Sequence, residues 1–206
     1  MAERLSVCLI NPRFEPSFWG FDFALPLMPG QKRCWVVTGA LPALAALVPE
    51  NCDVELIDEN VEALDFDNLE RFDVIGVTGM IVQGRRMFEI LDRLQGVRGR
   101  VVVGGPYVSV AESLFEDVSD VRFVGEAEET WPAFLKALMA GEPVSDRYEQ
   151  PDKTDMRKVP APRYDLLKAD RYLMASLQFS RGCPFLCEFC DIITIFGRRP
   201  RVKAAS

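Results

Sequence analysis

Three cysteines near the C-terminal end of the sequence have the spacing of a metal-binding loop. Cys183, Cys187 and Cys190 form the pattern C-x3-C-x2-C. Thiolates are soft ligands that suit zinc or an iron–sulfur cluster. A closed structural zinc site takes four ligands, and the sequence has no histidine to supply the fourth. The three thiols therefore predict an iron–sulfur site with one metal position open to a small molecule.

These cysteines have two alternative interpretations, a zinc site completed by a ligand from outside the chain and a set of free thiols. The other cysteines show no ligand spacing. Cys8 lies within an apolar run, which predicts core packing, and Cys34 and Cys52 are predicted to have no part in the site. The absence of histidine also excludes histidine-based acid–base catalysis and histidine metal ligands within this sequence.

Short apolar runs predict the strands that position a second set of candidate residues. The runs cover residues 5–10, 54–57, 74–77, 101–103 and 121–124. Their nearly continuous apolar character is typical of strands buried on both faces of a parallel sheet. Helices are predicted between them, most clearly over 87–94 and 131–138, where apolar residues recur at i, i+3, i+4 and i+7. Weaker helical patterns cover 41–48, 61–72 and 110–118.

This alternation predicts an α/β fold, a doubly wound five-stranded parallel sheet of Rossmann-like type over residues 1–140. The carboxyl ends of parallel strands meet at one edge of such a sheet, where ligands bind. Glycines at that edge let backbone amides approach a bulky ligand closely. The candidate ligand-binding residues that follow the strands are Asn11, Pro12, Thr78, Gly79, Met80, Gly104, Gly105, Pro106, Gly125 and Glu126.

The sequence beyond the sheet changes in character. Prolines among charged residues predict an interdomain linker over 141–171. A further run, Met174–Ser180, predicts a strand that leads into the cysteines, so residues 172–206 are assigned to a second domain. A complete (β/α) barrel takes about 200 residues or more. We therefore expect only the truncated start of a barrel, which would be inactive by itself.

Composition limits the classes of partner. The net charge of -7 argues against a nucleic-acid-binding surface, which is normally basic. No uninterrupted apolar stretch reaches the roughly 18 residues of a transmembrane helix, since the best candidate, Trp35–Val48, contains Thr38, Gly39 and Pro42. The N-terminus is unlike a signal peptide. A cytoplasmic protein without a transmembrane segment is expected.

The cysteine segment resembles the signature of radical S-adenosylmethionine (radical SAM) enzymes, C-x3-C-x-aromatic-C, with Phe189 at the aromatic position. The resemblance implies that Cys183, Cys187 and Cys190 bind three irons of a [4Fe-4S] cluster, and that the fourth iron chelates S-adenosyl-L-methionine. Electron transfer from a donor such as flavodoxin or ferredoxin would then cleave the sulfonium and yield a 5′-deoxyadenosyl radical.

An α/β domain before such a motif resembles the cobalamin-binding architecture. The resemblance implies that the loops after the strands hold cobalamin. Gly104-Gly105 would lie against the corrin face or its nucleotide tail, and Gly125-Glu126 would bond the ribose or the side-chain amides. Many cobalamin domains carry Asp-x-His-x-x-Gly, whose histidine ligates cobalt. This sequence has no histidine, so the implied cobalamin would have no protein histidine ligand.

Residues 15–22, residues 80–83 and the cysteine segment together resemble a subgroup that includes hopanoid C-methylases. This implies methyl transfer to an unactivated carbon of a small-molecule or lipid substrate. The aromatic-rich segment 15–22 either covers the ligand or packs against the rest of the barrel. The alternatives to such an enzyme are a cobalamin carrier or sensor without radical chemistry, a zinc-binding structural protein, and an α/β domain kept for stability or substrate docking.

Overall fold

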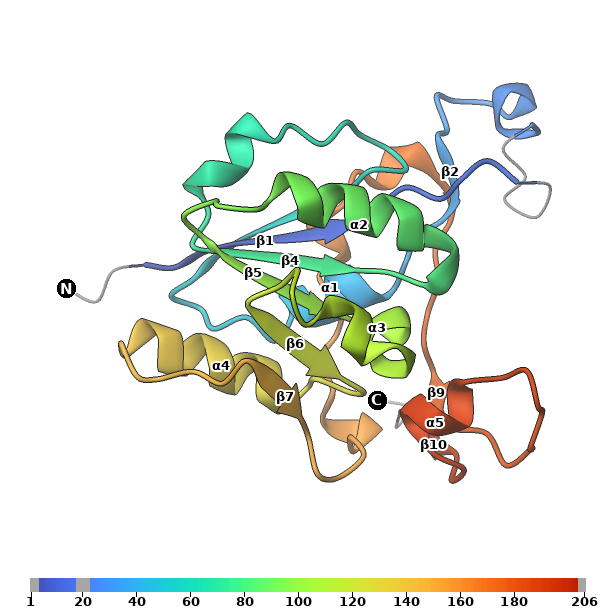
Figure 1. Cartoon of the computed structure of the whole chain (residues 1–206). Helices are drawn as coiled ribbons and strands as arrows, with labels where there is room; N and C mark the ends of the chain where they lie inside the picture. Colours follow the sequence, from blue (N-terminus) through green and yellow to red (C-terminus); the bar gives the residue numbers. More distant parts are fainter. Residues whose placement is uncertain (1–3, 18–22, 204–206) are drawn as a thin grey trace.

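The computed structural model describes residues 4–17 and 23–203, and a six-stranded sheet forms its centre (Figure 1). The strand order is β3-β1-β4-β5-β6-β7, and every neighbouring pair is parallel. The strands are β1 (Ser6–Asn11), β3 (Asp53–Asp58), β4 (Val74–Thr78), β5 (Arg100–Gly104), β6 (Val121–Val124) and β7 (Arg147–Glu149). The predicted parallel α/β fold is confirmed.

Two hydrophobic cores lie on the two faces of the sheet, because side chains alternate along each strand. In β1, Cys8 and Ile10 face one core, whereas Val7 and Leu9 face the other. The first core is covered by α2 (Gly84–Arg93) and α3 (Pro106–Val110). The second is covered by α1 (Ala40–Ala45) and α4 (Thr130–Met139). Burial on both faces explains why these strands are nearly all apolar, and core packing of Cys8 is confirmed.

The weaker helical predictions are only partly correct. The segment 61–72 contains a 3-10 helix over Asp67–Arg71 and no α-helix. In the region of 110–118, the α-helix α3 ends at Val110 and is followed by a 3-10 helix, Glu112–Phe115. In both segments, single apolar side chains such as Leu69 and Phe115 are fully buried. Tertiary packing therefore fixes their path without a long helix.

A sixth strand, β7, corrects the predicted five-stranded sheet. It lies within the stretch interpreted from the sequence as linker, and it pairs with β6 at the edge of the sheet. Its sequence, Arg-Tyr-Glu, lacks the apolar run of a buried strand. Tyr148 nevertheless stacks on Phe123 with ring centroids 5.0 Å apart. A three-residue segment with a single aromatic side chain is too short to predict a strand from the sequence.

The predicted strand Met174–Ser180 is wrong, because the structure divides this run between two small sheets. β8 (Tyr172–Met174) pairs with β2 (Cys34–Val36), and β9 (Ser180–Arg181) pairs with β10 (Arg201–Val202). A short helix, α5 (Ile192–Phe196), lies between β9 and β10 in the chain. Figure 1 shows this C-terminal segment beyond the carboxyl ends of the sheet strands. No helix among the described residues has the length and apolar character to cross a membrane.

Candidate cofactor-binding site

A cavity of about 1160 Å³ opens at the carboxyl edge of the sheet. One wall is formed by the ends of β1, β4, β5 and β6, a second by β2 and α1, and a third by the segment before and after the cysteines. The volume exceeds the roughly 300–1,000 Å³ typical of pockets for drug-sized ligands. The cavity is therefore large enough for a bulky cofactor.

The cavity lies at the topological switch point of the sheet. From β1 the chain builds β3 on one side, and it then crosses to build β4 on the other. The carboxyl ends of β1 and β4 consequently diverge into different loops, which leaves the crevice where α/β sheets bind ligands. Asn11 ends β1 and Thr78 ends β4, and both line the cavity.

The floor of the cavity reaches the sheet itself between α1 and α4. Leu9, Gly76, Val102 and Phe123 all line it from neighbouring strands. Gly76 is the residue without a side chain, and a Cβ placed there would lie 2.7 Å from Leu9 Cδ2. The Leu9 side chain therefore fills the space over Gly76, and any side chain at position 76 would have to displace Leu9 from its place in the cavity lining. Trp131 of α4 also lines the cavity, and its indole Nε1 is buried without a hydrogen-bond partner among the described residues.

Gly105 fixes the loop that joins β5 to α3. Its φ of +94° lies in the region that favours glycine, and a Cβ there would collide with Thr78 Oγ1. Pro106 follows at the first position of α3. The Tyr107 amide donates to Gly79 O at 3.2 Å, and Ser109 Oγ accepts from the Gly125 amide at 2.9 Å. α3 thus holds the loops after β4, β5 and β6 together at the cavity.

A buried polar network fixes the loops after β1, β3 and β4. Asn11 Nδ2 donates to Asp58 Oδ1 at 3.0 Å, and Gln83 Nε2 donates to Asn11 Oδ1 at 2.9 Å. Gln83 also accepts from the Met80 amide at 2.9 Å. Tyr172 OH donates to Asp58 Oδ2 at 2.8 Å. Since buried polar groups are costly unless bonded, this network holds Asn11 and Met80 in place at the switch point.

The structure brings most of the predicted ligand-binding residues together. The members of that set that line the cavity are Asn11, Thr78, Gly79, Met80, Gly104, Gly105, Pro106, Gly125 and Glu126. Pro12 is not part of the lining, and its carbonyl accepts hydrogen bonds from Gln83 and Asn60. Of the aromatic-rich segment, Glu15, Pro16 and Ser17 line the cavity, whereas residues 18–22 lie outside the described residues. A cofactor-binding role for the set stays a prediction.

The wall formed by β2 and α1 was missed by the sequence reasoning. Trp35, Thr38 and Leu44 line the cavity, as does Cys34, which was expected to have no part in the site. The sequence does carry a signal for this wall, namely an apolar segment that is too short to span a membrane and is interrupted by Thr38 and Gly39. Gly76, in the middle of a β-branched strand, was a second signal, because an isolated glycine in a strand often marks a close approach.

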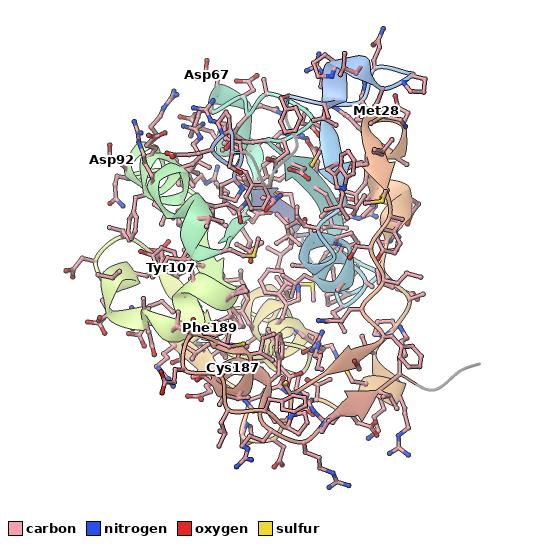
Figure 2. All side chains as sticks on the ribbon, turned by 90° about the vertical axis from the view of Figure 1, so that its right-hand side faces the viewer. Met28, Asp67, Asp92, Tyr107, Cys187 and Phe189 are labelled. Carbon is pink, nitrogen blue, oxygen red and sulfur yellow. The ribbon has the colours of Figure 1, made fainter. Side chains whose placement is uncertain are left out.

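The three cysteines lie in the loop between β9 and β10 and are not gathered around a common point. Cys187 is exposed, whereas Cys183 and Cys190 are half-buried. No group of three or more Cys, Asp or Glu side chains within residues 4–17 and 23–203 could hold a metal ion. Figure 2 shows Phe189 and Cys187 below Tyr107 in that view, and α5 contacts α3. The Phe189 side chain is 91% exposed. Metal binding by the cysteines stays a prediction.

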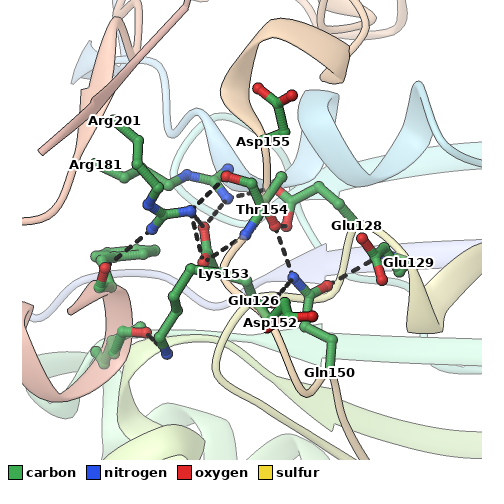
Figure 3. Close-up of polar contacts among 12 residues, drawn as sticks. Glu126, Glu128, Glu129, Gln150, Asp152, Lys153, Thr154, Asp155, Arg181 and Arg201 are labelled. Carbon is green, nitrogen blue, oxygen red and sulfur yellow. Dashed lines mark hydrogen bonds and ion pairs between the residues drawn. The ribbon is translucent and has the colours of Figure 1, made fainter. Parts of the chain in front are cut away.

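Glu126 joins the cavity to the cysteine loop (Figure 3). Its carboxylate accepts from Arg181 Nη1 at 2.8 Å and from the Thr154 amide at 3.1 Å, and it pairs with Arg201 Nη1 at 3.0 Å. The Glu126 side chain is 0% exposed. Both carboxylate oxygens are thus engaged by protein groups, and a hydrogen bond from Gly125-Glu126 to a ligand stays a prediction.

Comparison with known proteins identifies the domain around the cavity. Residues 35–135 match the family model of the B12 binding domain. The chain is 39% identical over 196 residues to an uncharacterized methyltransferase of Synechocystis sp., which covers 95% of the chain and 36% of that relative. It is 32% identical over 200 residues to the hopanoid C-2 methylase of Rhodopseudomonas palustris, covering 96% of the chain and 38% of the methylase.

A third relative is named for a different substrate. The chain is 27% identical over 172 residues to the bacteriochlorophyllide d C-8(2)-methyltransferase of Chlorobaculum tepidum, covering 80% of the chain and 38% of that enzyme. The chain thus spans little more than a third of the length of these relatives. The match to the domain model and the similarity along nearly the whole chain agree with the cavity: residues 35–135 match a B12 binding domain, and the chain is similar to the hopanoid methylases.

Proposed function

We propose that this chain is the cofactor-binding part of a cobalamin-dependent radical SAM methyltransferase. The observation that carries the proposal is the cavity of about 1160 Å³ at the switch point of a B12-binding domain, next to the segment with three cysteines. Residues 1–140 would bind cobalamin, 141–171 would connect the parts, and 172–206 would begin the radical SAM domain. The substrate would be a small molecule or a lipid with an unactivated carbon to be methylated.

The volume and the lining residues of the cavity support a corrin cofactor as its ligand. Bound cobalamin would supply a cobalt that carries a methyl group. The glycine loops after β4 and β5 would approach the corrin, and the apolar floor at Leu9 and Gly76 would lie against the ligand. The unpaired indole N–H of Trp131 is a donor for a polar group there. With no histidine in the chain, the protein would supply no histidine ligand to cobalt.

The thiols of Cys183, Cys187 and Cys190 fit an iron–sulfur cluster by the chemistry of the donor set. Three soft ligands without histidine leave one iron open. Cys183, Cys187 and Cys190 would hold a [4Fe-4S] cluster, which with one electron from flavodoxin or ferredoxin would supply reductive cleavage of S-adenosyl-L-methionine into methionine and a 5′-deoxyadenosyl radical. The protein's own contribution is to hold the cysteine loop at the cavity and to exclude water with the apolar side chains of Met80 and Val82, which line its rim.

Cobalamin titration of the chain tests the cavity. We expect Gly76→Val to weaken cobalamin binding at least about ten-fold, because the added side chain would displace Leu9 and change the floor of the cavity. Ile75→Val is the matched control, since Ile75 lies in the same strand and packs in the opposite core. It should lower stability slightly and leave affinity unchanged. Equal affinity for cobalamin in wild type and Gly76→Val would rule out the cavity floor at Gly76 as part of the site.

Anaerobic reconstitution of the full-length gene product, with and without cobalamin, tests the radical chemistry. We expect iron and acid-labile sulfide to depend on the three cysteines, and 5′-deoxyadenosine to form from S-adenosyl-L-methionine. Corrin binding without a cluster under these conditions would instead indicate a carrier or sensor. Stoichiometric zinc without sulfide would indicate a structural zinc protein.

A further inference from the structure

The cysteine loop is closed at its base by two arginines that lie directly opposite each other. β9 and β10 pair antiparallel, with Arg181 facing Arg201 in register. All three cysteines lie between these two residues in the sequence. Like charges directly opposite each other across strands are destabilising. The pairing of β9 with β10, which involves only two residues of each strand, therefore requires a negative charge near the two arginines to stay formed.

Glu126 supplies that counter-charge from the end of β6. It contacts Nη1 of both arginines, at 2.8 Å from Arg181 and 3.0 Å from Arg201, as Figure 3 shows. The Arg181 side chain is 8% exposed and that of Glu126 is 0% exposed. Charges so deeply buried are stable only when paired. Glu128 adds a second carboxylate that pairs with Arg181 Nη1, which balances the two positive charges.

The same contacts tie the loop to the cavity. Gly125 and Ala127, on either side of Glu126, line the cavity, and so do Arg181 and Phe196 from the other wall. Arg201 Nη2 also donates to the carbonyl of Phe196 at 2.9 Å, at the end of α5. One buried carboxylate therefore holds the sheet edge, the base of the cysteine loop and α5 in a single arrangement.

We infer that Glu126 is a positioning residue, which holds the cysteine loop against the mouth of the cavity by neutralising Arg181 and Arg201. The inference deepens the proposed function, because it assigns the group that fixes the cysteines relative to the cobalamin cavity. Its mechanism is electrostatic. Removing the negative charge leaves Glu128 as the carboxylate partner of Arg181 and takes from Arg201 its carboxylate partner among the described residues, and the pairing of β9 with β10 should open.

Amide hydrogen exchange of the chain without any cofactor tests this inference. We expect Glu126→Gln to speed exchange across residues 179–203 at least about ten-fold, within the range of typical coupling between sites. The amides of Cys183 and Lys203, which bond to Gly197 O and Phe179 O, should respond most. The double variant Glu126→Gln with Arg201→Gln should restore slow exchange in part, because it removes the repulsion. If Glu126 acted only through packing, the effects of the two single substitutions on the exchange rate would instead add up in the double variant.

Glu112→Gln is the matched control. Glu112 also lies between two arginines paired in register, Arg122 and Arg147 of β6 and β7, and it is remote in sequence from the cysteine loop. Its replacement should leave exchange in 179–203 unchanged. Unchanged exchange in Glu126→Gln, or a double variant that exchanges faster than either single one, would overturn the inference. The readout needs no cofactor, so failure of the chain to bind cobalamin would contradict the proposed function and leave this result standing.

Discussion

At the scale of single residues, the candidate site depends on a few positions at the carboxyl edge of the sheet, where a single side chain or a glycine determines the path of a loop. Gly105 needs a φ of +94°, and a Cβ there would collide with Thr78. We expect Gly105→Ala to lower the free energy of unfolding by about 1–3 kcal/mol, since a non-glycine residue in such a region is strained. Urea denaturation measures the change. Gly39→Ala, where a Cβ meets nothing within 4 Å, should cost much less.

Tyr172 makes stability depend on pH in the alkaline range. Burial and the nearby Asp58 carboxylate raise the pKa of Tyr172 above its ordinary value of 10.0. The unfolded chain releases the Tyr172 proton at a lower pH than the folded chain does. The stabilisation contributed by the protonated hydroxyl is therefore fully present below pH 10, and it is lost as the pH rises above 10. Urea denaturation between pH 8 and pH 11 should show a steeper loss for wild type than for Tyr172→Phe.

Wild type and Tyr172→Phe differ only in the Tyr172 hydroxyl, which donates to Asp58 Oδ2 at 2.8 Å. At pH 8 we expect Tyr172→Phe to be less stable by about 1.5–3 kcal/mol, the contribution of a hydrogen bond to a charged group. Tyr148→Phe provides a control, because that ring stacks on Phe123 and its hydroxyl makes no bond to a carboxylate among the described residues, accepting only from the exposed Ser145 amide at 3.1 Å. Parallel pH profiles for wild type and Tyr172→Phe would contradict the role of burial.

At the scale of elements, α3 holds three strand ends together although it has only five residues. Ser109 Oγ donates to Gly105 O at 2.8 Å and accepts from the Gly125 amide at 2.9 Å. Ser109→Ala should lower the free energy of unfolding by about 1–3 kcal/mol, because a partly buried amide loses its acceptor. It should also weaken cobalamin binding through the displaced loop at Gly125. Ser113→Ala, at an exposed serine of the next turn, should change neither the stability nor the affinity.

At the scale of the whole molecule, the cavity walls come from distant parts of the sequence, so a ligand that fills it should stabilise the entire fold. Cobalamin at about one hundred times its Kd should add about 2.7 kcal/mol to the free energy of unfolding. For a chain of this size, Tm should rise by about 5–10 °C. Differential scanning calorimetry measures the shift, which should be smaller in Gly76→Val. A wild-type Tm that is independent of saturating cobalamin would contradict the assignment.

The sequence determined the strands of the sheet core and the edge at which the site lies. Strands buried on both faces carry an unmistakable apolar pattern, and the glycine and polar residues that follow them mark the carboxyl edge. This is why Asn11, Thr78 and Gly105 were predicted together at one edge from local pattern alone. The cysteine spacing is likewise a local signal, and it indicated metal chemistry without any knowledge of the fold.

Only the tertiary structure decided what closes the site. β7 pairs at the edge through a three-residue strand with little apolar character, and β2 supplies a wall from a segment with no polar motif. Glu126 reads in the sequence as a ligand-binding residue, but the fold surrounds its carboxylate with Arg181 and Arg201 from 55 and 75 positions away. Such pairings depend on the energy of burying charges together, and that energy depends on neighbours in space, which local sequence patterns do not record.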